Sequence, residues 1–372
     1  MLNEQPKIIF ALGTRPEAIK LAPLIIECKK EGLKVLVVST GQHREMLDQV
    51  LEIFDIKPDY DLGIMSKVKN LSEIASHVLI GLDKIILKEK PNLVVVQGDT
   101  SSAFVAGLAA FHNKVKVAHV EAGLRTYNKY SPFPEEMNRK LLSAIADYHF
   151  APTESAKRAL IKEGIDEKTI YVTGNTVIDA LNVVSAVEMP FVDKEIKDID
   201  FINKDIILLT THRRENLDTG MQNIFDAINK ITKDNPNVEI IFPVHLNPAI
   251  GEHAKNVLGH NSSVHLLEPL CYTDLVGVLK KCKLVLTDSG GIQEEAPAFG
   301  KPVLVLRDTT ERPEGVEAGT CKLIGLNKED IINNTNELLK NPESYEKMAK
   351  AVNPYGDGTS SKQIVAVIKN DR

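Results

Sequence analysis

The sequence has few cysteines, and none is placed to build a scaffold. Cys28, Cys271, Cys282 and Cys321 are widely spaced and form no C-x-x-C or Cys/His metal pattern. They fit a reduced, intracellular protein with buried thiols, and we expect no metal site.

Long apolar runs are also lacking. No segment approaches the ~20 apolar residues that a membrane span needs, and residues 8–12 near the N-terminus form a run of strand length only. A formal net charge of −6, spread along 372 residues, argues against a nucleic-acid-binding surface but leaves room for a local basic phosphate pocket. We therefore expect a soluble, cytoplasmic protein without membrane or nucleic-acid partners.

Familiar nucleotide and metal motifs are absent too. The chain has no G-x-G-x-x-G after a strand, no G-x-x-x-x-G-K-[ST] and no H-E-x-x-H. A tightly held nicotinamide cofactor, a Walker-type ATPase and a zinc protease are thus not supported.

Length and strand–helix alternation predict two α/β domains. A chain of 372 residues exceeds the size at which one core keeps growing. Apolar strands alternate with helices up to Val187 and again from Asp205, which predicts two Rossmann-like, doubly wound parallel sheets. The charged segment 188–205 predicts a linker, with or without a short helix. Ligands bind at the carboxyl ends of such strands, so two domains facing each other would share a central cleft.

The stretch 284–314 predicts a compact βαβ unit. An apolar strand (284–287) leads through Asp288 and Ser289 into Gly290 and Gly291, which open a short helix. Backbone N–H groups at such a helix start attract phosphate. An ordinary αβ turn explains these residues equally well.

Charged residues follow within the same stretch. We place Glu294 and Glu295 in the first turn of the helix, where a carboxylate could face a ribose hydroxyl. Arg307 and Arg312, just past the next strand, could supply charge to a diphosphate.

Charged side chains also follow the strands of the first half. Arg15 and Lys20 come after the first strand, as a phosphate site or as surface decoration. Asp99 follows a strand, where helix N-capping is as good an explanation as catalysis. Glu121 ends another strand, and Glu135 starts a helix. Convergence of three carboxylates is typical of acid–base sites, in which they titrate as a group.

Two histidines occupy equivalent strand ends in the second half. His212 follows one strand, beside Arg213 and Arg214, and His245 follows the next. A single histidine is usually satisfied by backbone groups, but two in this position favour phosphate contact or proton transfer.

Eight segments in order over residues 13–315 closely resemble the non-hydrolysing uridine diphosphate (UDP) N-acetylglucosamine 2-epimerases. The segments are GTRPEAIKLAP, QGDTSS, HVEAGLRT, SPFPEEMNR, THRREN, PVHLNP, LTDSGGIQEEAP and RDTTERPE. The resemblance implies a glycosyltransferase-B type fold, with the active site between two domains and the last helix packed on the first. The expected domains are 1–187 completed by 358–372, and 188–357.

The resemblance also implies residue roles. Asp99, Glu121 and Glu135 would be the acid–base carboxylates, with His212 also catalytic. The implied substrate-binding set adds Arg15, Lys20, His245, Leu270, Leu275, Ser289, Gly290, Gly291, Glu295 (on the ribose) and Arg312 to Asp99, Glu121 and His212.

The implied reaction is reversible C2 epimerisation of UDP-N-acetylglucosamine to UDP-N-acetylmannosamine. The family needs no cofactor: it eliminates UDP to give 2-acetamidoglucal and adds UDP back with the C2 proton on the opposite face. The product would serve surface polysaccharide or glycan synthesis, and a homodimer is expected. Alternatives are a hydrolysing 2-epimerase, a glycosyltransferase of the same fold and a non-catalytic nucleotide-sugar sensor.

Three positions depart from the family pattern. Leu270 replaces a polar residue found in some members. Bacterial members bind a second substrate molecule as activator beside a Gln-His-Arg-Gln segment, which here is 42–45 and ends in Glu45. Val68 stands where a basic residue is expected, and both changes weaken the expectation of such an activator site.

Overall fold

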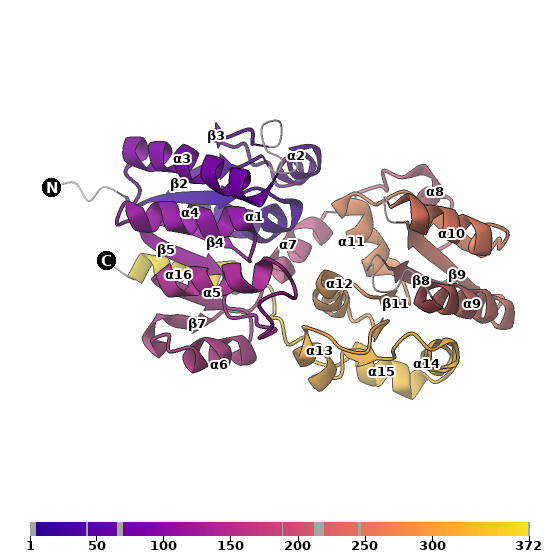
Figure 1. The fold of residues 1–372 in the computed structure, drawn as a ribbon. Helices are drawn as coiled ribbons and strands as arrows, with labels where there is room; N and C mark the ends of the chain where they lie inside the picture. Colours follow the sequence, from indigo (N-terminus) through magenta and orange to yellow (C-terminus); the bar gives the residue numbers. More distant parts are fainter. Residues whose placement is uncertain are drawn as a thin grey trace. The chain divides into compact units, whose positions relative to one another are not determined.

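The computed structural model describes residues 5–41, 44–64, 70–187, 189–211, 219–244 and 247–370. The chain divides into two compact units, which are coloured along the sequence in Figure 1. Unit 1 comprises Met1–Val183 and Tyr355–Arg372, and unit 2 comprises Val184–Pro354. Each unit is a parallel sheet with its own helices, which confirms the predicted α/β class.

Unit 1 is built on a seven-stranded sheet in the order β3-β2-β1-β4-β5-β6-β7, with every pairing parallel. The strands are β1 (Lys7–Leu12), β2 (Lys34–Ser39), β3 (Tyr60–Asp61), β4 (Leu93–Gln97), β5 (Lys116–Val120), β6 (Tyr148–Ala151) and β7 (Ile170–Val172). The helices are α1 (Arg15–Lys30), α2 (Arg44–Ile53), α3 (Leu71–Glu89), α4 (Ser101–His112), α5 (Glu135–Ile145), α6 (Glu154–Lys162), α7 (Thr176–Ser185) and the C-terminal α16 (Ser360–Asn370).

Unit 2 has a six-stranded parallel sheet in the order β10-β9-β8-β11-β12-β13. The strands are β8 (Asp205–Thr210), β9 (Val238–Pro243), β10 (Val264–Leu267), β11 (Leu284–Thr287), β12 (Val303–Val305) and β13 (Cys321–Leu323). The helices are α8 (Lys194–Lys197), α9 (Thr219–Asp234), α10 (Pro248–Leu258), α11 (Tyr272–Lys281), α12 (Gly290–Glu295), α13 (Pro313–Glu317), α14 (Lys328–Lys340) and α15 (Pro342–Ala349).

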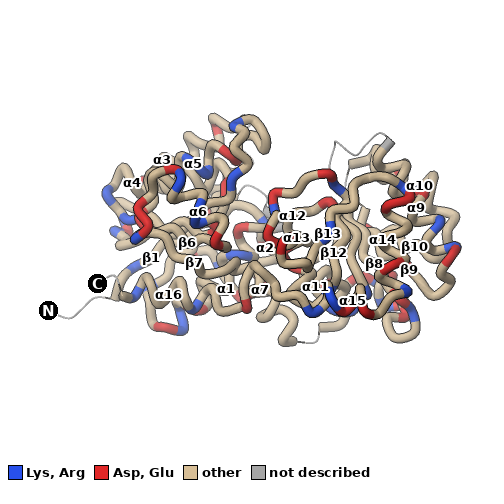
Figure 2. The backbone as a smooth tube through the Cα atoms, turned by 90° about the horizontal axis from the view of Figure 1, so that it is seen from below, with Lys and Arg blue, Asp and Glu red and all other residues tan. Residues whose placement is uncertain are grey.

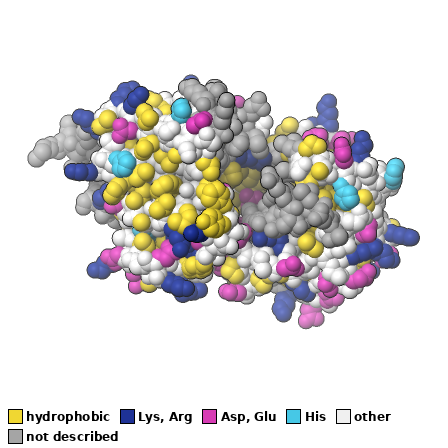
Figure 3. Space-filling model, in the orientation of Figure 1, with side chains coloured by type: hydrophobic (Ala, Val, Ile, Leu, Met, Phe, Trp, Pro, Cys, Tyr) yellow, Lys and Arg dark blue, Asp and Glu magenta, His cyan; other side chains and the backbone are white. Residues whose placement is uncertain are grey.

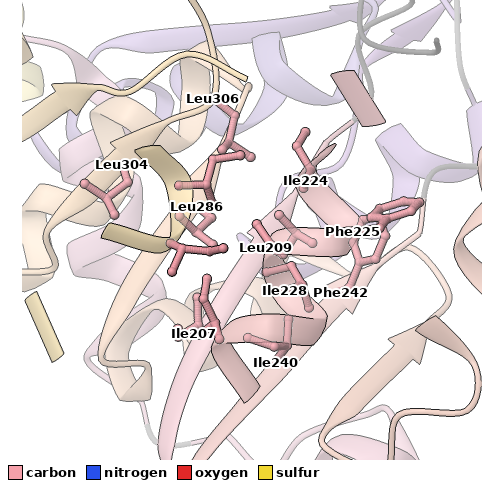
Figure 4. Close-up of a cluster of buried hydrophobic side chains, with 14 of the residues drawn as sticks. Ile207, Leu209, Ile224, Phe225, Ile228, Ile240, Phe242, Leu286, Leu304 and Leu306 are labelled. Atoms are coloured by element: carbon pink, nitrogen blue, oxygen red, sulfur yellow. The ribbon is translucent and has the colours of Figure 1, made fainter. Parts of the chain in front are cut away.

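Alternate strand residues cover the two faces of the unit 2 sheet with apolar side chains. Ile207 and Leu209 of β8 pack with Phe225 and Ile228 of α9 on one face (Figure 4). Ile206 and its alternate neighbours join the cluster on the other face, under α11 and α12. A sheet buried on both faces requires near-continuous apolar strands, which explains the runs read in the sequence.

Both sheets have a topological switch point, where the strand order reverses. In unit 1 it lies between β1 and β4, which pair directly, and in unit 2 between β8 and β11. In this architecture the loops after the two strands of a switch point usually diverge to opposite faces, and ligands usually bind there.

The segment 188–205 is more structured than a simple linker. A short helix, α8, lies within it, and Ile196 and Ile199 are buried in the unit 2 core. The backbone N–H groups of Val192 and Asp193 donate to the two carboxylate oxygens of Asp274, each at 2.8 Å. Among the described residues, this segment therefore packs as part of unit 2.

The last helix completes unit 1. α16 packs against α1, and its side chains Ile364 and Val365 are buried. Its N-terminal end is held by Asp179 of α7, whose Oδ1 accepts the Ser361 N–H at 2.8 Å.

We expect Ile364→Ala to destabilise the protein by about 2–4 kcal/mol, because the fully buried side chain leaves a cavity between α16 and α1. Urea unfolding of the full chain measures the loss. Ile161→Ala, the same truncation at a 41%-exposed position of α6, should cost less than about 1 kcal/mol. Equal losses for the two variants would mean that α16 does not dock through Ile364.

Candidate functional site

The switch point of unit 1 is held together by a buried carboxylate, Glu17. Its Oε2 accepts the N–H groups of Gly13 and Thr14 at 2.8 and 2.7 Å and the Thr14 hydroxyl at 3.0 Å. Its Oε1 accepts the Thr100 hydroxyl at 2.5 Å. One side chain thus ties the loop after β1, which carries Arg15, to the loop after β4. Burial raises the pKa of the Glu17 carboxyl, against the opposing effect of the hydrogen bonds from Thr100, Gly13 and Thr14.

Asp99 lies in the loop after β4, and it is not a helix cap. Thr100 is the N-cap of α4, since its hydroxyl accepts the Ala103 N–H at 3.0 Å. The N-capping alternative for Asp99 is therefore wrong. The Asp99 carboxylate forms an ion pair with Arg139 of α5, and its backbone carbonyl accepts from the Asn138 amide at 2.8 Å.

Helix α5 brings further acidic groups to this loop. Glu135 begins α5 one turn before Arg139, so the two side chains project from the same face of the helix. The neighbouring Glu136 is fully buried and structural: it accepts the N–H groups of Thr126 and Tyr127, each at 2.9 Å. Glu136 Oε2 also lies 3.5 Å from Arg139 Nη1, whereas Glu135 is half-exposed.

Glu121 directly follows β5 in a left-handed conformation, with φ 64°. A non-glycine residue adopts this geometry rarely, and at a strand end it is a known mark of functional sites. Glu121 Oε2 forms an ion pair with Lys20 of α1 and accepts the Asn175 amide N–H at 2.9 Å. The structure therefore brings together Lys20 and Glu121, two residues singled out in the sequence.

His119, two residues before Glu121, supports the loop after β4. Its Nε2 lies 2.8 Å from the carbonyl oxygen of Gly98, so this nitrogen carries the proton and donates. Burial lowers the pKa of the His119 imidazole to about 3, and the ring is neutral at physiological pH. The turn that presents Asp99 is thus fixed by a donor that does not titrate near neutrality.

In unit 2 the turn after β11 is shaped by hydroxyl groups. The hydroxyls of Thr287 and Thr210 hydrogen-bond across the switch-point strands at 2.5 Å. Thr287 Oγ1 also accepts the Ser289 N–H at 2.9 Å, and the buried Asp288 accepts from the Thr211 hydroxyl at 2.9 Å. These bonds place Ser289 at the N-cap of α12.

The glycines of this turn leave room above the backbone. A Cβ added at Gly291 would meet only Ser289 Oγ, at 4.0 Å, within 4 Å. A Cβ at Gly290 would lie 3.9 Å from the guanidinium carbon of Arg312. Arg312 therefore lies beside the glycine turn, as expected for a group that contacts the same ligand.

The expected position of Glu294 and Glu295 is wrong. They are the last two residues of the six-residue α12, not part of its first turn. Glu294 is buried and forms an ion pair with Arg312, while Arg307 Nη2 lies 3.5 Å from Glu311 Oε1. Both arginines are thus oriented by carboxylates of their own unit.

Leu270 and Leu275 belong to an apolar environment. Leu270 is buried in the core cluster under the sheet, and Leu275 of α11 packs against it. A contact of Leu270 with a ligand would therefore use its backbone. His212, His245, residues 42–43 and Val68 lie outside the described residues, as does the side chain of Glu45.

Four residues that contact the strand-end loops or their carboxylates were given no role from the sequence: Glu17, His119, Arg139 and Asn175. Each lies within one of the segments quoted above or, for Asn175, in Gly174-Asn175-Thr176 at the start of α7. A Gly-Asn-Thr turn between a strand and a helix was the available signal for Asn175. Arg139 could have been found from its i, i+4 spacing to Glu135.

Comparison with known proteins decides the family. A model of the UDP-N-acetylglucosamine 2-epimerase family matches residues 26–369. A protein of that name from Bacillus subtilis is 52% identical over 362 residues, covering 96% of this chain and 94% of that protein. The chain belongs to the UDP-N-acetylglucosamine 2-epimerase family. The resemblance noted in the sequence is thereby confirmed, and the family is one of isomerases.

Solved structures of the family share the fold. The 2-epimerase of Neisseria meningitidis, solved bound to UDP-GlcNAc, is 48% identical with a TM-score of 0.90, covering 98% of this chain and 100% of that one. The 2-epimerase of Methanocaldococcus jannaschii, in complex with UDP-GlcNAc and UDP, is 37% identical with a TM-score of 0.79, covering 98% and 99%. These matches confirm the predicted glycosyltransferase-B fold class.

The distribution of charge, the length of apolar helices and the grouping of possible metal ligands bear on what nucleic-acid-binding, membrane and metal proteins need. Acidic and basic residues are interspersed along both units (Figure 2). No helix within the described ranges is long and apolar enough to cross a membrane. The part of the chain that the structure describes also contains no group of three His, Cys, Asp or Glu side chains suited to hold a metal ion.

We expect Glu17→Ala to destabilise the protein by about 2–4 kcal/mol, because it leaves two N–H groups and two hydroxyls of the switch point without their acceptor. Urea unfolding tests this. Glu27→Ala, on the same helix, removes a single ion pair with the exposed Lys30 at 3.5 Å and should change stability by less than about 1 kcal/mol. A Glu17 variant as stable as the Glu27 variant would contradict the bridging role.

Proposed function

We propose that the protein is a non-hydrolysing 2-epimerase that interconverts UDP-N-acetylglucosamine and UDP-N-acetylmannosamine. Family membership supports the substrate and the reaction type. The observation that carries the proposal is the pairing of strand-end carboxylates with cations in unit 1, Asp99 with Arg139 and Glu121 with Lys20. Carboxylates at neighbouring strand ends, each beside a positive charge, suit proton transfer next to a departing diphosphate.

The reaction proceeds through elimination and re-addition. A carboxylate of unit 1 takes the C2 proton, the C1–C2 double bond of 2-acetamidoglucal forms, and the C1–O bond breaks with its electron pair leaving on UDP. Re-addition joins a β-phosphate oxygen to C1 and a proton to the opposite face of C2. Asp99 and Glu121 are the first candidates for these transfers and Glu135 the third, with His212 as a further catalytic group. No cofactor enters this scheme.

The nucleotide contacts assigned by resemblance lie in unit 2. Ser289, Gly290 and Gly291 form a turn open to solvent at Gly291, which supports close approach of a phosphate to the backbone. Glu295, 8% exposed at the end of α12, is proposed to contact the ribose. Arg312, oriented by Glu294 next to Gly290, is proposed to contact the diphosphate.

Three broader features complete the proposal. The product would feed surface polysaccharide or glycan synthesis. All four cysteines are free thiols, which supports a reducing, cytoplasmic compartment.

A homodimer is supported by the resemblance and by the exposed apolar side chains of unit 1. Release of free UDP and N-acetylmannosamine by a hydrolysing relative is not favoured, since the matched relatives carry the 2-epimerase name.

We expect the enzyme, incubated with UDP-N-acetylglucosamine in deuterated water, to place deuterium at C2 of both sugars and to accumulate UDP-N-acetylmannosamine. Asp99→Asn and Glu121→Gln should each lower the turnover number by about 10²–10⁴-fold, because each removes a proton-transfer group. Nuclear magnetic resonance measures both exchange and product.

The matched control is Asp83→Asn. Asp83 of α3 accepts the Asn113 amide at 2.7 Å and is remote in sequence from the strand-end loops, so this variant should keep wild-type turnover. Stoichiometric free UDP would reject the non-hydrolysing reaction. Protonated C2 in deuterated water would reject proton exchange. Full turnover of Asp99→Asn would reject Asp99 as a proton-transfer group, whereas a wild-type protein that binds UDP-N-acetylglucosamine without turning it over would favour the sensor alternative.

We also expect Leu87→Glu to convert a dimer into monomers. Apolar side chains gather over α3 and α4 of unit 1 in Figure 3, and Leu87 of α3 is 60% exposed and Phe111 of α4 55% exposed. Sedimentation velocity gives the mass of each species. Ile202→Glu, at a 92%-exposed position of unit 2, should leave the dimer intact. A monomeric wild-type protein would contradict the homodimer.

A further inference from the structure

Asn175 is a buried side chain beside Glu121. It follows β7, immediately precedes α7 and is 2% exposed. Its side-chain Nδ2 donates to Glu121 Oε2 at 2.9 Å. The contact joins residues 54 positions apart, so it depends on the tertiary fold of unit 1.

The orientation of this amide is fixed by its other end. The Asn175 Oδ1 accepts the Val177 N–H at 3.1 Å. A flipped amide would place its NH₂ against that N–H and its oxygen against the Glu121 carboxylate, so both contacts would be repulsive. Asn175 therefore presents a donor to Glu121.

The backbone of Asn175 is anchored as well. Its N–H donates to the carbonyl of Tyr355 at 2.7 Å, and its carbonyl accepts the Ile178 N–H at 3.1 Å. Tyr355 is the first residue of unit 1 after the chain returns from unit 2. A Cβ at the preceding Gly174 would lie 3.1 Å from that same carbonyl oxygen, so the approach needs a glycine.

The anchored Asn175 side chain fixes the position of the Glu121 carboxylate. Its carboxylate oxygen Oε2 receives two donors, the Lys20 ammonium and the Asn175 amide, from different elements. Two donors converging on one oxygen set the direction of the carboxylate, which a single flexible lysine would not do. The left-handed backbone of Glu121 also needs support from its surroundings.

We propose that Asn175 is a positioning residue for the reaction, orienting the Glu121 carboxylate through a neutral donor. The proposal rests on the proton-transfer role of Glu121 in the proposed function. It adds that the turn between β7 and α7 belongs to the catalytic machinery, although Asn175 itself need not touch the substrate.

The charged groups around Glu121 and Asn175 determine how an aspartate at position 175 would affect the Glu121 carboxylate. Lys20 faces Glu121 from α1, and His119 of β5 is kept neutral by burial. Asp179, one turn along α7 from Asn175, is turned to Ser361 of α16, and burial raises the pKa of its carboxyl. An aspartate at position 175 would thus meet Glu121 as a like charge, with Lys20 as the cation between them.

The test compares Asn175→Asp and Asn175→Ala with the wild-type enzyme in pH profiles of turnover. In Asn175→Asp one limb of the profile should move to higher pH by about one unit, because the two carboxylates titrate as a pair. Asn175→Ala, which removes the donor without adding charge, should move the same limb by less. Both variants should lose about 10-fold or more in kcat, with KM for UDP-N-acetylglucosamine changed by less than about 3-fold.

Asn113→Asp is the matched control. Asn113 also donates its amide to a carboxylate of unit 1, Asp83, at 2.7 Å, so this variant creates the same kind of pair elsewhere. Its pH profile and kcat should equal those of the wild type. If Asn175→Asp does not fold, the kcat and pH profile of Asn175→Ala alone test the positioning role.

Different results would contradict the proposed epimerase activity and the positioning role of Asn175. A wild-type protein without C2 exchange would remove the proposed function, and a fully active Glu121→Gln variant would remove the proton-transfer role of Glu121 on which the proposal rests. An active wild type with an inactive Glu121→Gln, combined with folded Asn175 variants of unchanged kcat and pH profile, would overturn the positioning role alone.

Discussion

The site of unit 1 depends on a single buried carboxylate, Glu17, which holds two loops that the sheet topology drives apart. β1 and β4 are neighbours at the point where the strand order reverses, and in a doubly wound sheet the chain leaves two such strands towards opposite faces. Glu17 binds the backbone of one loop and the Thr100 hydroxyl of the other. Arg15 and Asp99 therefore start from defined backbone positions.

Compensated charge is the second organising feature. Asp99 is paired with Arg139, Glu121 with Lys20 and Glu294 with Arg312, and all six side chains are at least three-quarters buried. Buried charges without partners would cost several kcal/mol each. Paired, they can stay buried, and each cation also orients the carboxylate beside it. Neutral groups, the His119 imidazole and the Asn175 amide, complete the arrangement without adding charge.

The sequence was sufficient for the alternating architecture because strands buried on both faces must be continuously apolar. It was insufficient for the short elements β13 and α13, which are three and five residues long and carry no periodicity. It could place Asp99 and Glu121 at strand ends, since that follows from chain order. It could not show that Thr100 caps α4, or that Arg139 and Asn175 reach these carboxylates, because such contacts depend on how distant elements pack. The roles of the site residues stay predictions.

The docking of α16 on α1 has a consequence for the order in which the protein is made. Unit 1 begins at the N-terminus but is completed by the final helix, with all of unit 2 synthesised between the two parts. On the ribosome, unit 2 can therefore be finished while α1 still exposes the apolar surface that α16 will cover. Of the two units, unit 1 is the first whose synthesis begins and the last whose fold can be completed. A chain that stops before Ile364 lacks the helix that covers α1, so unit 1, which carries Asp99 and Glu121, stays incomplete.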